Sequence, residues 1–184
     1  MLTVSIVVGN PKPKSRTLTV AKTLATKLIG DSEHHLHTVD LVDVADEIML
    51  WPNETLDTLN NVVASSDLAI FASPTYKASY TGLLKAFLDR YPDNGLRGVV
   101  AIPIFTGGSL AHSMAPTMNL VPLLTELGAI VPGRGSYFVM DKMDEIETVV
   151  GNFADEYLSN IEAISKIALE LKITNSHKIT LPSI

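Results

Sequence analysis

The chain has 184 residues, the length of a single domain, with 14 Lys and Arg against 20 Asp and Glu and a formal net charge of −6. This acidic balance, without a basic stripe or interleaved aromatic residues, excludes nucleic acid as an expected partner, and no apolar run reaches the roughly 18–20 residues that span a bilayer. Because there is no cysteine, disulfides, thiolate nucleophiles and cysteine-ligated iron–sulfur clusters are excluded, which fits a cytoplasmic protein. Any redox chemistry would have to come from a bound cofactor.

Apolar blocks alternate with helix-period segments along the chain, without an internal repeat or a low-complexity linker. Unbroken apolar runs are typical of strands buried on both faces, whereas apolar residues every three or four positions predict helices. In chain order the sequence predicts strand 2–8, helix 17–29, strand 36–41, helix 56–65, strand 67–72, helix 81–90, strand 99–105, helix 110–127, strand 131–139 and helix 143–171. Pro116 and Pro122 interrupt helix 110–127, and Pro122 is expected to bend it. Residues 1–174 are predicted to form one domain and residues 175–184 a tail.

Strands that alternate with helices in this way predict an α/β fold with a parallel sheet and right-handed crossovers. Two doubly wound strand orders fit the pattern, the Rossmann type and the flavodoxin type. In both, ligands bind beyond the carboxyl ends of the strands, at the point where the strand order reverses. We therefore expect the functional residues in the loops that follow the first, third and fourth strands.

The first of these loops, residues 9–17, places cations and hydroxyls at the start of a helix. It contains neither the glycine pattern of dinucleotide-binding turns nor that of a P-loop. Arg16, with Lys12 and Lys14 before it and the hydroxyls of Ser15 and Thr17 beside it, suits a phosphate monoester at a helix N-terminus. The alternative interpretation is that Ser15 or Thr17 only caps the helix, with the cations in solvent.

The second loop, residues 73–80, presents Tyr76 and Lys77 directly after a strand and a proline. An aromatic turn at this point can lie against a planar ring, and a cation can offset negative charge on it. The alternative is a loop in which Ser79 or Thr81 caps the next helix and Tyr76 packs on the surface.

The third loop runs from Thr106 to Ser109 and contains two adjacent glycines, which permit close backbone approach to a ligand. A tight turn with Ser109 as helix cap explains the same residues. His112 lies one turn further on and is a candidate catalytic group, although a structural or solvent-facing histidine is the commoner case. Together the three loops offer a phosphate site, a turn that faces a ring and an edge of backbone amides, which is the outline of FMN.

Other chemically suggestive residues are interpreted as structural. His34, His35 and His37 lie at the entry to a strand without a metal-ligand pattern, so no metal site is expected. Trp51, in the loop after the second strand, can border the pocket, form a subunit contact or pack in the core. The acidic cluster 141–147 favours a helix N-terminus, where negative charge is stabilising.

On these residues the chain resembles the NADPH-dependent FMN reductase family, especially the branch that supplies reduced FMN to two-component monooxygenases such as the alkanesulfonate type. The resemblance implies a flavodoxin-like, five-stranded parallel sheet of order 2-1-3-4-5 with helices on both faces, and a homodimer or homotetramer. It also implies hydride transfer from NAD(P)H, with NADPH favoured, to N5 of FMN. The matching segments are Gly9 with Ser15-Arg16-Thr17, the run 73–85, Thr106-Gly107-Gly108-Ser109 with His112, and the segment 120–129.

The resemblance assigns site residues to three groups. The phosphate group would be held by Ser15, Arg16 and Thr17, with Asn10 nearby. The ribityl chain and the isoalloxazine ring would be contacted by Pro74, Thr75, Tyr76 and Lys77. The pyrimidine edge of the ring would be lined by Thr106, Gly107, Gly108 and Ser109.

Three positions depart from the pattern of the family. Asn10 stands where serine is usual, Val121 stands where a basic residue is common, and Met118 falls where some members that use flavin as a substrate have an aromatic residue. The last difference leaves open whether FMN is a retained prosthetic group or a released product. Two other functions also stay open: an FMN-bound quinone or azo-dye reductase, and a non-enzymatic flavodoxin-like electron carrier.

Overall fold

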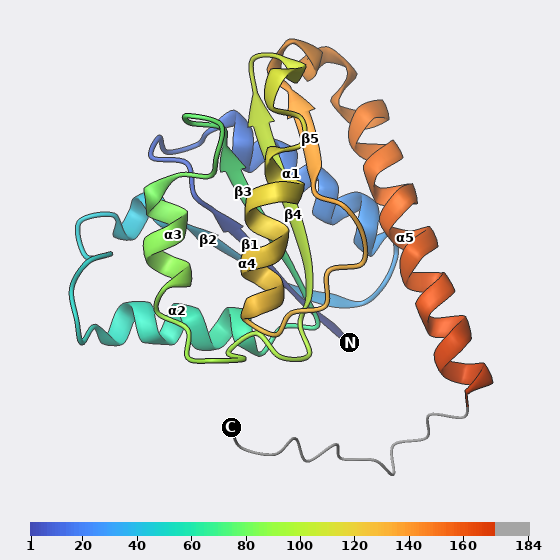
Figure 1. The fold of residues 1–184 in the computed structure, drawn as a ribbon, viewed down its shortest axis with the longest axis horizontal. Helices are drawn as coiled ribbons and strands as arrows, with labels where there is room; N and C mark the ends of the chain where they lie inside the picture. Colours follow the sequence, from blue (N-terminus) through green and yellow to red (C-terminus); the bar gives the residue numbers. More distant parts are fainter. Residues whose placement is uncertain (172–184) are drawn as a thin grey trace.

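A five-stranded parallel sheet forms the centre of the molecule, with helices on both of its faces (Figure 1). The computed structural model describes residues 1–171. The strand order is β2-β1-β3-β4-β5, and every neighbouring pair is parallel. This confirms the predicted flavodoxin-type order and decides against the Rossmann type. The strands are β1 (Leu2–Val8), β2 (His34–Asp40), β3 (Leu68–Pro74), β4 (Val100–Gly107) and β5 (Ser136–Val139).

The helices divide between the two faces of the sheet according to the alternation of side chains along the strands. On one face, α1 (Arg16–Ile29) and α5 (Ile146–Glu170) pack against Ile6 and Ile104. On the other, α2 (Glu54–Ala64), α3 (Gly82–Leu88) and α4 (Val121–Glu126) pack against Phe71 and Phe105. The three central strands are therefore buried from both sides, which explains their continuous apolar sequences.

The prediction of one helix over 110–127 is wrong. The segment instead forms a short 3-10 helix, η2 (Leu110–His112), a π-helix, η3 (Pro116–Leu120), and then α4. Proline lacks a backbone N–H, so it is best tolerated in the first turn of a helix, where that N–H has no partner. Pro116 begins η3 and Pro122 lies in the first turn of α4, and the backbone stays right-handed helical from Ala115 through Val121, so η3 continues directly into α4.

The last strand is shorter than predicted, because only Ser136–Val139 of the segment 131–139 pairs with β4. Pro132 cannot donate to a strand ladder, and Gly135 lies where an added Cβ would come 2.6 Å from Cβ of Pro116. The chain therefore crosses η3 before it joins the sheet.

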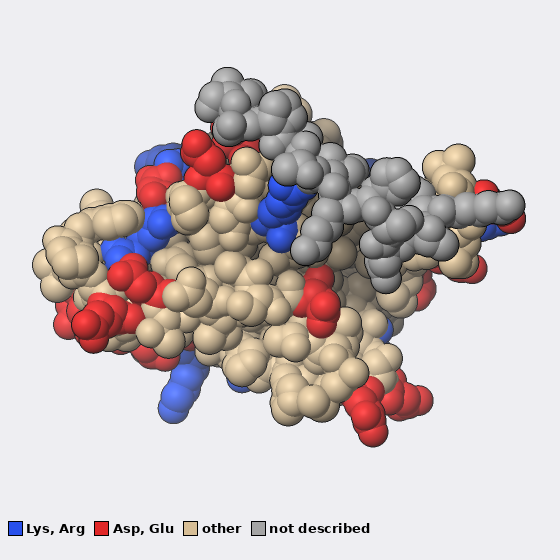
Figure 2. Space-filling model, turned by 90° about the horizontal axis from the view of Figure 1, so that it is seen from below, with Lys and Arg blue, Asp and Glu red and all other residues tan. Residues whose placement is uncertain are grey.

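The remaining boundaries shift by a few residues. Two more 3-10 helices occur besides η2: η1 (Leu41–Val44) follows β2, and η4 (Met140–Glu145) precedes α5. The predicted tail, residues 175–184, lies outside the described residues. Within residues 1–171, no helix is long and apolar enough to cross a membrane. On the face at the amino ends of the strands, the described cationic and acidic side chains are interspersed with a majority of uncharged residues (Figure 2).

Candidate functional site

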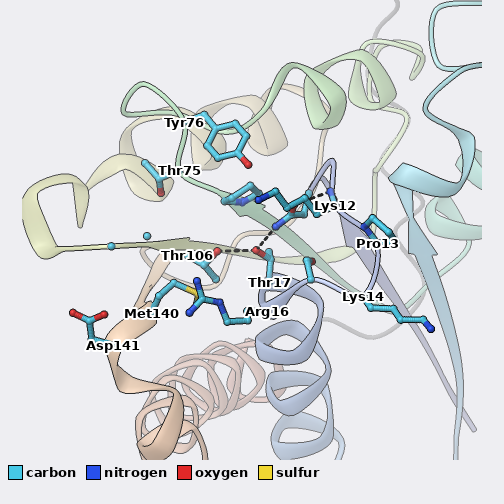
Figure 3. Close-up of a pocket in the computed structure, with 15 residues that line it drawn as sticks. Lys12, Pro13, Lys14, Arg16, Thr17, Thr75, Tyr76, Thr106, Met140 and Asp141 are labelled. Carbon is cyan, nitrogen blue, oxygen red and sulfur yellow. Dashed lines mark hydrogen bonds between the residues drawn. The ribbon is translucent and has the colours of Figure 1, made fainter.

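A cavity of about 550 Å³ opens at the carboxyl ends of the strands, between the loops that follow β1, β3 and β4 and the start of η4 (Figure 3). This is the switch point, where the connections from β1 and β3 leave toward opposite faces of the sheet. The lining residues are Asn10, Lys12, Pro13, Lys14, Ser15, Arg16, Thr17, Pro74, Thr75, Tyr76, Thr106, Gly107, Gly108, Met140 and Asp141.

Three buried polar side chains join separate elements at the floor of the cavity. The Nδ2 of Asn10 donates to Oγ1 of Thr17 at 3.0 Å, and the hydroxyls of Thr17 and Thr106 lie 2.8 Å apart (Figure 3). Asn10 also accepts, through Oδ1, from the backbone N–H of Lys12 at 3.0 Å. These bonds fix the loop after β1 and the start of α1 against the end of β4.

The N-terminus of α1 points into the same space. Ser15 is the cap residue, and its hydroxyl accepts from the backbone N–H of Leu18 at 3.2 Å, so the capping interpretation of Ser15 is correct. Capping does not compete with an anion site, because Arg16 and Thr17 open the helix and their N–H groups belong to the first turn, which has no intrahelical acceptors. The first turn of α1 contains no acidic residue.

The opposite end of the cavity is built mainly by backbone shape. Thr75 donates its N–H to the carbonyl of Thr106 at 2.8 Å, which joins the ends of β3 and β4. A Cβ added at Gly107 would lie 1.9 Å from the hydroxyl of Tyr137, so Tyr137 of β5 would have to move to admit a side chain there. At Gly108 nothing lies within 4 Å of an added Cβ, and this residue borders open space.

The hydroxyl of Thr75 is buried, and Oγ1 has no hydrogen-bond partner among the described residues. A buried polar atom without a partner is costly, and in a cavity wall it indicates a group that a ligand can satisfy. Thr75 therefore marks a polar contact point on the wall opposite Asp141 (Figure 3).

A tight turn positions Tyr76 over the cavity. The backbone groups of Tyr76 and Ser79 bond each other in both directions, at 2.9 and 3.1 Å, while Lys77 and Ala78 both have positive φ, 51° and 64°. Non-glycine residues adopt this conformation only where their surroundings hold it. Asn119 of η3 supplies one such contact, because its Nδ2 donates to the carbonyl of Ala78 at 3.1 Å.

The structure brings most of the predicted site residues to one cavity. Lys77, Ser109 and His112 do not line it. Ser109 instead caps η2, where its hydroxyl accepts from the N–H of Ala111 at 3.4 Å, and His112 is exposed. Thr81, the other predicted cap, accepts from the N–H of Leu84 at the start of α3.

Two lining residues, Met140 and Asp141, lie outside the three predicted loops. The acidic cluster 141–147 was interpreted only as a favourable start for the last helix. The position of Asp141 in the sequence could have indicated its place in the cavity, because Asp141 follows the fifth strand by two residues and that strand neighbours β4 in the flavodoxin order.

The other residues interpreted as structural, Trp51 and the three histidines, do not line the cavity. Trp51 is 62% exposed and is stacked by the guanidinium of Arg90, whose Cζ lies 4.1 Å from the ring centroid, so the core-packing option is wrong. Arg90 itself is fixed by Asp57 at 2.6 Å. His34, His35 and His37 lie along β2 with exposed side chains, and residues 1–171 contain no group of three or more His, Cys, Asp or Glu that could hold a metal ion.

Comparison with known proteins gives a consistent result. The sequence profile of the NADPH-dependent FMN reductase family matches residues 2–144. The chain is 34% identical over 165 residues to an FMN reductase (NADPH) of Escherichia coli, across 88% of this chain and 83% of the relative. It is 30% identical over 129 residues to the NADH-dependent FMN reductase SfnF of Pseudomonas fluorescens, across 67% and 68%. Among solved structures, the apo form of an NADH:FMN oxidoreductase (EMOB) superposes with a TM-score of 0.76 at 29% identity, across 86% of this chain and 90% of that one.

Proposed function

The chain belongs to the NADPH-dependent FMN reductase family, and from this premise we propose that its cavity at the carboxyl ends of the strands binds FMN. It is an enzyme, an oxidoreductase that uses NAD(P)H to reduce FMN. When bound, FMN supplies the redox chemistry by accepting the hydride at N5 of its ring, while the protein binds and orients the reactants. The observation that carries the proposal is that the loops after β1, β3 and β4 line one space, at the point where flavodoxin-like folds bind FMN.

The residues present fit the phosphate of FMN. Ser15, Arg16 and Thr17 would hold it through the backbone N–H groups at the start of α1 and the guanidinium, with Lys12 and Lys14 beside them. The amide of Asn10 would act by orienting Thr17, since Nδ2 is bonded to that hydroxyl at 3.0 Å.

The other end of the cavity fits the ribityl chain and the isoalloxazine ring. The hydroxyl of Thr75, which has no partner among the described residues, would bond a polar atom of the ligand, and Tyr76 would flank the ring. The pocket-lining residues Pro74, Thr106, Gly107 and Gly108 would border the ribityl chain and the pyrimidine edge. Lys77 and Ser109 adjoin lining residues in the chain, and we propose that they contact the ligand from the rim. No side-chain acid or base is required, so His112 receives no catalytic role.

We propose NADPH rather than NADH as the hydride donor. The relative of 34% identity is named for NADPH, whereas SfnF is named for NADH. The cations at the mouth of the cavity favour the dinucleotide with the additional phosphate. Steady-state kinetics at saturating FMN test this directly, because the same lysines lie beside the FMN phosphate: Lys12→Gln and Lys14→Gln should each lower kcat/KM for NADPH about tenfold more than kcat/KM for NADH. Equal losses with both donors would contradict the proposal.

We further propose that reduced FMN is released to a flavin-dependent monooxygenase and that the enzyme is a cytoplasmic homodimer or homotetramer. The resemblance to reductases of two-component systems supports the first part. Adjacent exposed apolar side chains at Met49, Leu50 and Trp51 support self-association. Light scattering at increasing protein concentration checks the oligomeric state, and a monomer throughout would contradict it.

The decisive experiment compares electron acceptors. Purified protein should oxidise NADPH in proportion to added free FMN and saturate with it, with little activity when a quinone alone is supplied. FMN that copurifies, resists gel filtration and passes electrons to the quinone would instead identify a quinone reductase. Failure to oxidise either dinucleotide in the presence of FMN would refute the enzymatic function.

A further inference from the structure

The cavity is lined by three cations and one carboxylate, which come from different elements. Its cations, Lys12, Lys14 and Arg16, all come from the loop after β1 and the first residue of α1. Asp141 is the one carboxylate among the described lining residues, and it comes from η4, beyond Gly107 and Gly108 (Figure 3). Lys12 and Lys14 lie on the side of the cavity away from Asp141, whereas the side chain of Arg16 extends toward Met140 (Figure 3). A ligand with its phosphate at Ser15, Thr17 and the two lysines therefore extends its other end toward Asp141.

The carboxylate of Asp141 is available to act on a ligand. It forms no ion pair within residues 1–171, and its neighbour Lys142 is engaged elsewhere, with Nζ 2.6 Å from a carboxylate oxygen of Glu145. The backbone that carries Asp141 is anchored, because Met140 packs against the buried cluster beneath α1 and α5. Asp141 is thus a fixed negative charge at the cavity rim.

Reduction changes the charge of FMN at one end only. The phosphate keeps its charge, whereas the ring gains two electrons and one proton with the hydride and, near neutral pH, carries a negative charge that the oxidised ring lacks. Charge placed near the flavin ring is one of the means by which proteins tune it. A nearby carboxylate therefore raises the free energy of the reduced ring and has little effect on the neutral oxidised one.

We propose that Asp141 discriminates between the two redox states of FMN: it weakens binding of reduced FMN relative to oxidised FMN and so promotes release of the product. This inference rests on the proposed binding of FMN in the cavity. Lys12 and Lys14, on the side away from Asp141, attract both states alike through the phosphate, so they provide affinity without discrimination. Asp141 is accordingly a specificity-determining residue and needs no contact with the transferred hydride.

The size of the effect follows from Coulomb's law. Two unit charges across a cavity that water enters interact with an energy equivalent to about a three- to tenfold change in affinity. Because Asp141 is exposed, added salt should reduce the effect.

The test measures two dissociation constants for each variant, one for oxidised FMN and one for photoreduced FMN under anaerobic conditions. In Asp141→Asn, the ratio of the reduced to the oxidised constant should fall about three- to tenfold, with the oxidised constant nearly unchanged. Asp141→Glu should retain the wild-type ratio. Asp144→Asn is the matched control, because it removes the same charge from the same 3-10 helix at a residue outside the cavity lining, and it should leave the ratio unaltered.

Each outcome is informative. If Asp141→Asn weakens or strengthens both redox states equally, the carboxylate merely contacts the ligand and the inference is overturned. An unchanged ratio, or an equal change in the control, overturns it as well. The oxidised constant also shows whether the variant is folded. If the wild-type protein binds no oxidised FMN, the proposed function itself fails, which is distinguishable from failure of the inference alone.

Discussion

The two ends of the cavity are built in different ways. At the phosphate end, side chains are joined by hydrogen bonds: Asn10 to Thr17 at 3.0 Å, and Thr17 to Thr106 at 2.8 Å. At the ring end, backbone shape dominates, with Gly107 against Tyr137 and a turn held at positive φ. Binding at the phosphate end should therefore be most sensitive to the loss of single polar or charged groups, whereas the ring end should be most sensitive to added bulk.

The largest effect is expected from Gly107→Ala at the ring end. The new Cβ would lie 1.9 Å from the hydroxyl of Tyr137, so the Tyr137 side chain or one of the two strands must shift, with a loss of about 1–3 kcal/mol in the free energy of unfolding and a severe loss of FMN binding. Gly108→Ala is the matched control, because nothing lies within 4 Å of its added Cβ. Chemical denaturation of both variants checks this, and equal stability would show that Tyr137 does not constrain this end.

At the phosphate end, Arg16→Gln should weaken FMN binding about tenfold, because a charge-assisted contact is lost, and should leave the fold intact. Riboflavin lacks the phosphate, so its affinity should not change. Lys22→Gln, on the same helix but outside the cavity lining, serves as the control. Fluorescence titration with both flavins measures the difference. An equal loss for riboflavin would place the contribution of Arg16 at the ring instead.

The variant Thr75→Val tests whether the hydroxyl of Thr75 contributes to ligand binding or to the stability of the fold. Because Oγ1 of Thr75 has no partner among the described residues, removing it should leave stability unchanged or raise it by about 1 kcal/mol. FMN affinity should nevertheless fall about three- to tenfold. Measurement of the melting temperature and the dissociation constant on one preparation provides both values. A variant that loses stability while binding FMN normally would show that the hydroxyl serves the fold.

The smallest effect is expected at Asp40, at the end of β2 and outside the cavity. Burial raises the pKa of its carboxyl above the ordinary value of 3.8, with Asp43 adding to the shift, so the charged form costs stability at neutral pH. Asp40→Asn should therefore be more stable than the wild type at pH 7, by about 0.3 kcal/mol after solvent screening. The gain should diminish as the pH falls through the raised pKa and vanish below 3.8. Denaturation curves at both pH values check the sign, and a gain independent of pH would contradict the cause.

Sequence reasoning recovers those features that local patterns determine. Buried strands such as β3 consist of unbroken apolar runs and can be recognised in the sequence. The loops after these strands contain most of the residues that line the cavity. The strand order needed the resemblance to a family, because alternation alone fits two orders. Sequence reasoning could not show that Tyr137 constrains Gly107, since that contact joins two strands far apart in the sequence.

The errors have the same origin. Residues 110–127 have helical periodicity, but contacts with Gly135 and Ala78, both distant in sequence, accompany the π-helix and its short neighbours. The helix-start interpretation of Asp141 is confirmed, since Asp141 lies in the first turn of η4, but its place in the cavity was missed because that place depends on how β5 neighbours β4. Trp51 was a candidate for the core, and only the structure reveals that it stacks on Arg90 at the surface.

A crystal structure of the protein with FMN tests the central claim most directly. The phosphate should lie within hydrogen-bond distance of the backbone N–H groups of Arg16 and Thr17, and Oγ1 of Thr75 should bond a polar atom of the ligand. The ring should lie between Tyr76 and Gly108. FMN bound elsewhere, or bound in this cavity with its phosphate toward Asp141, would contradict the account.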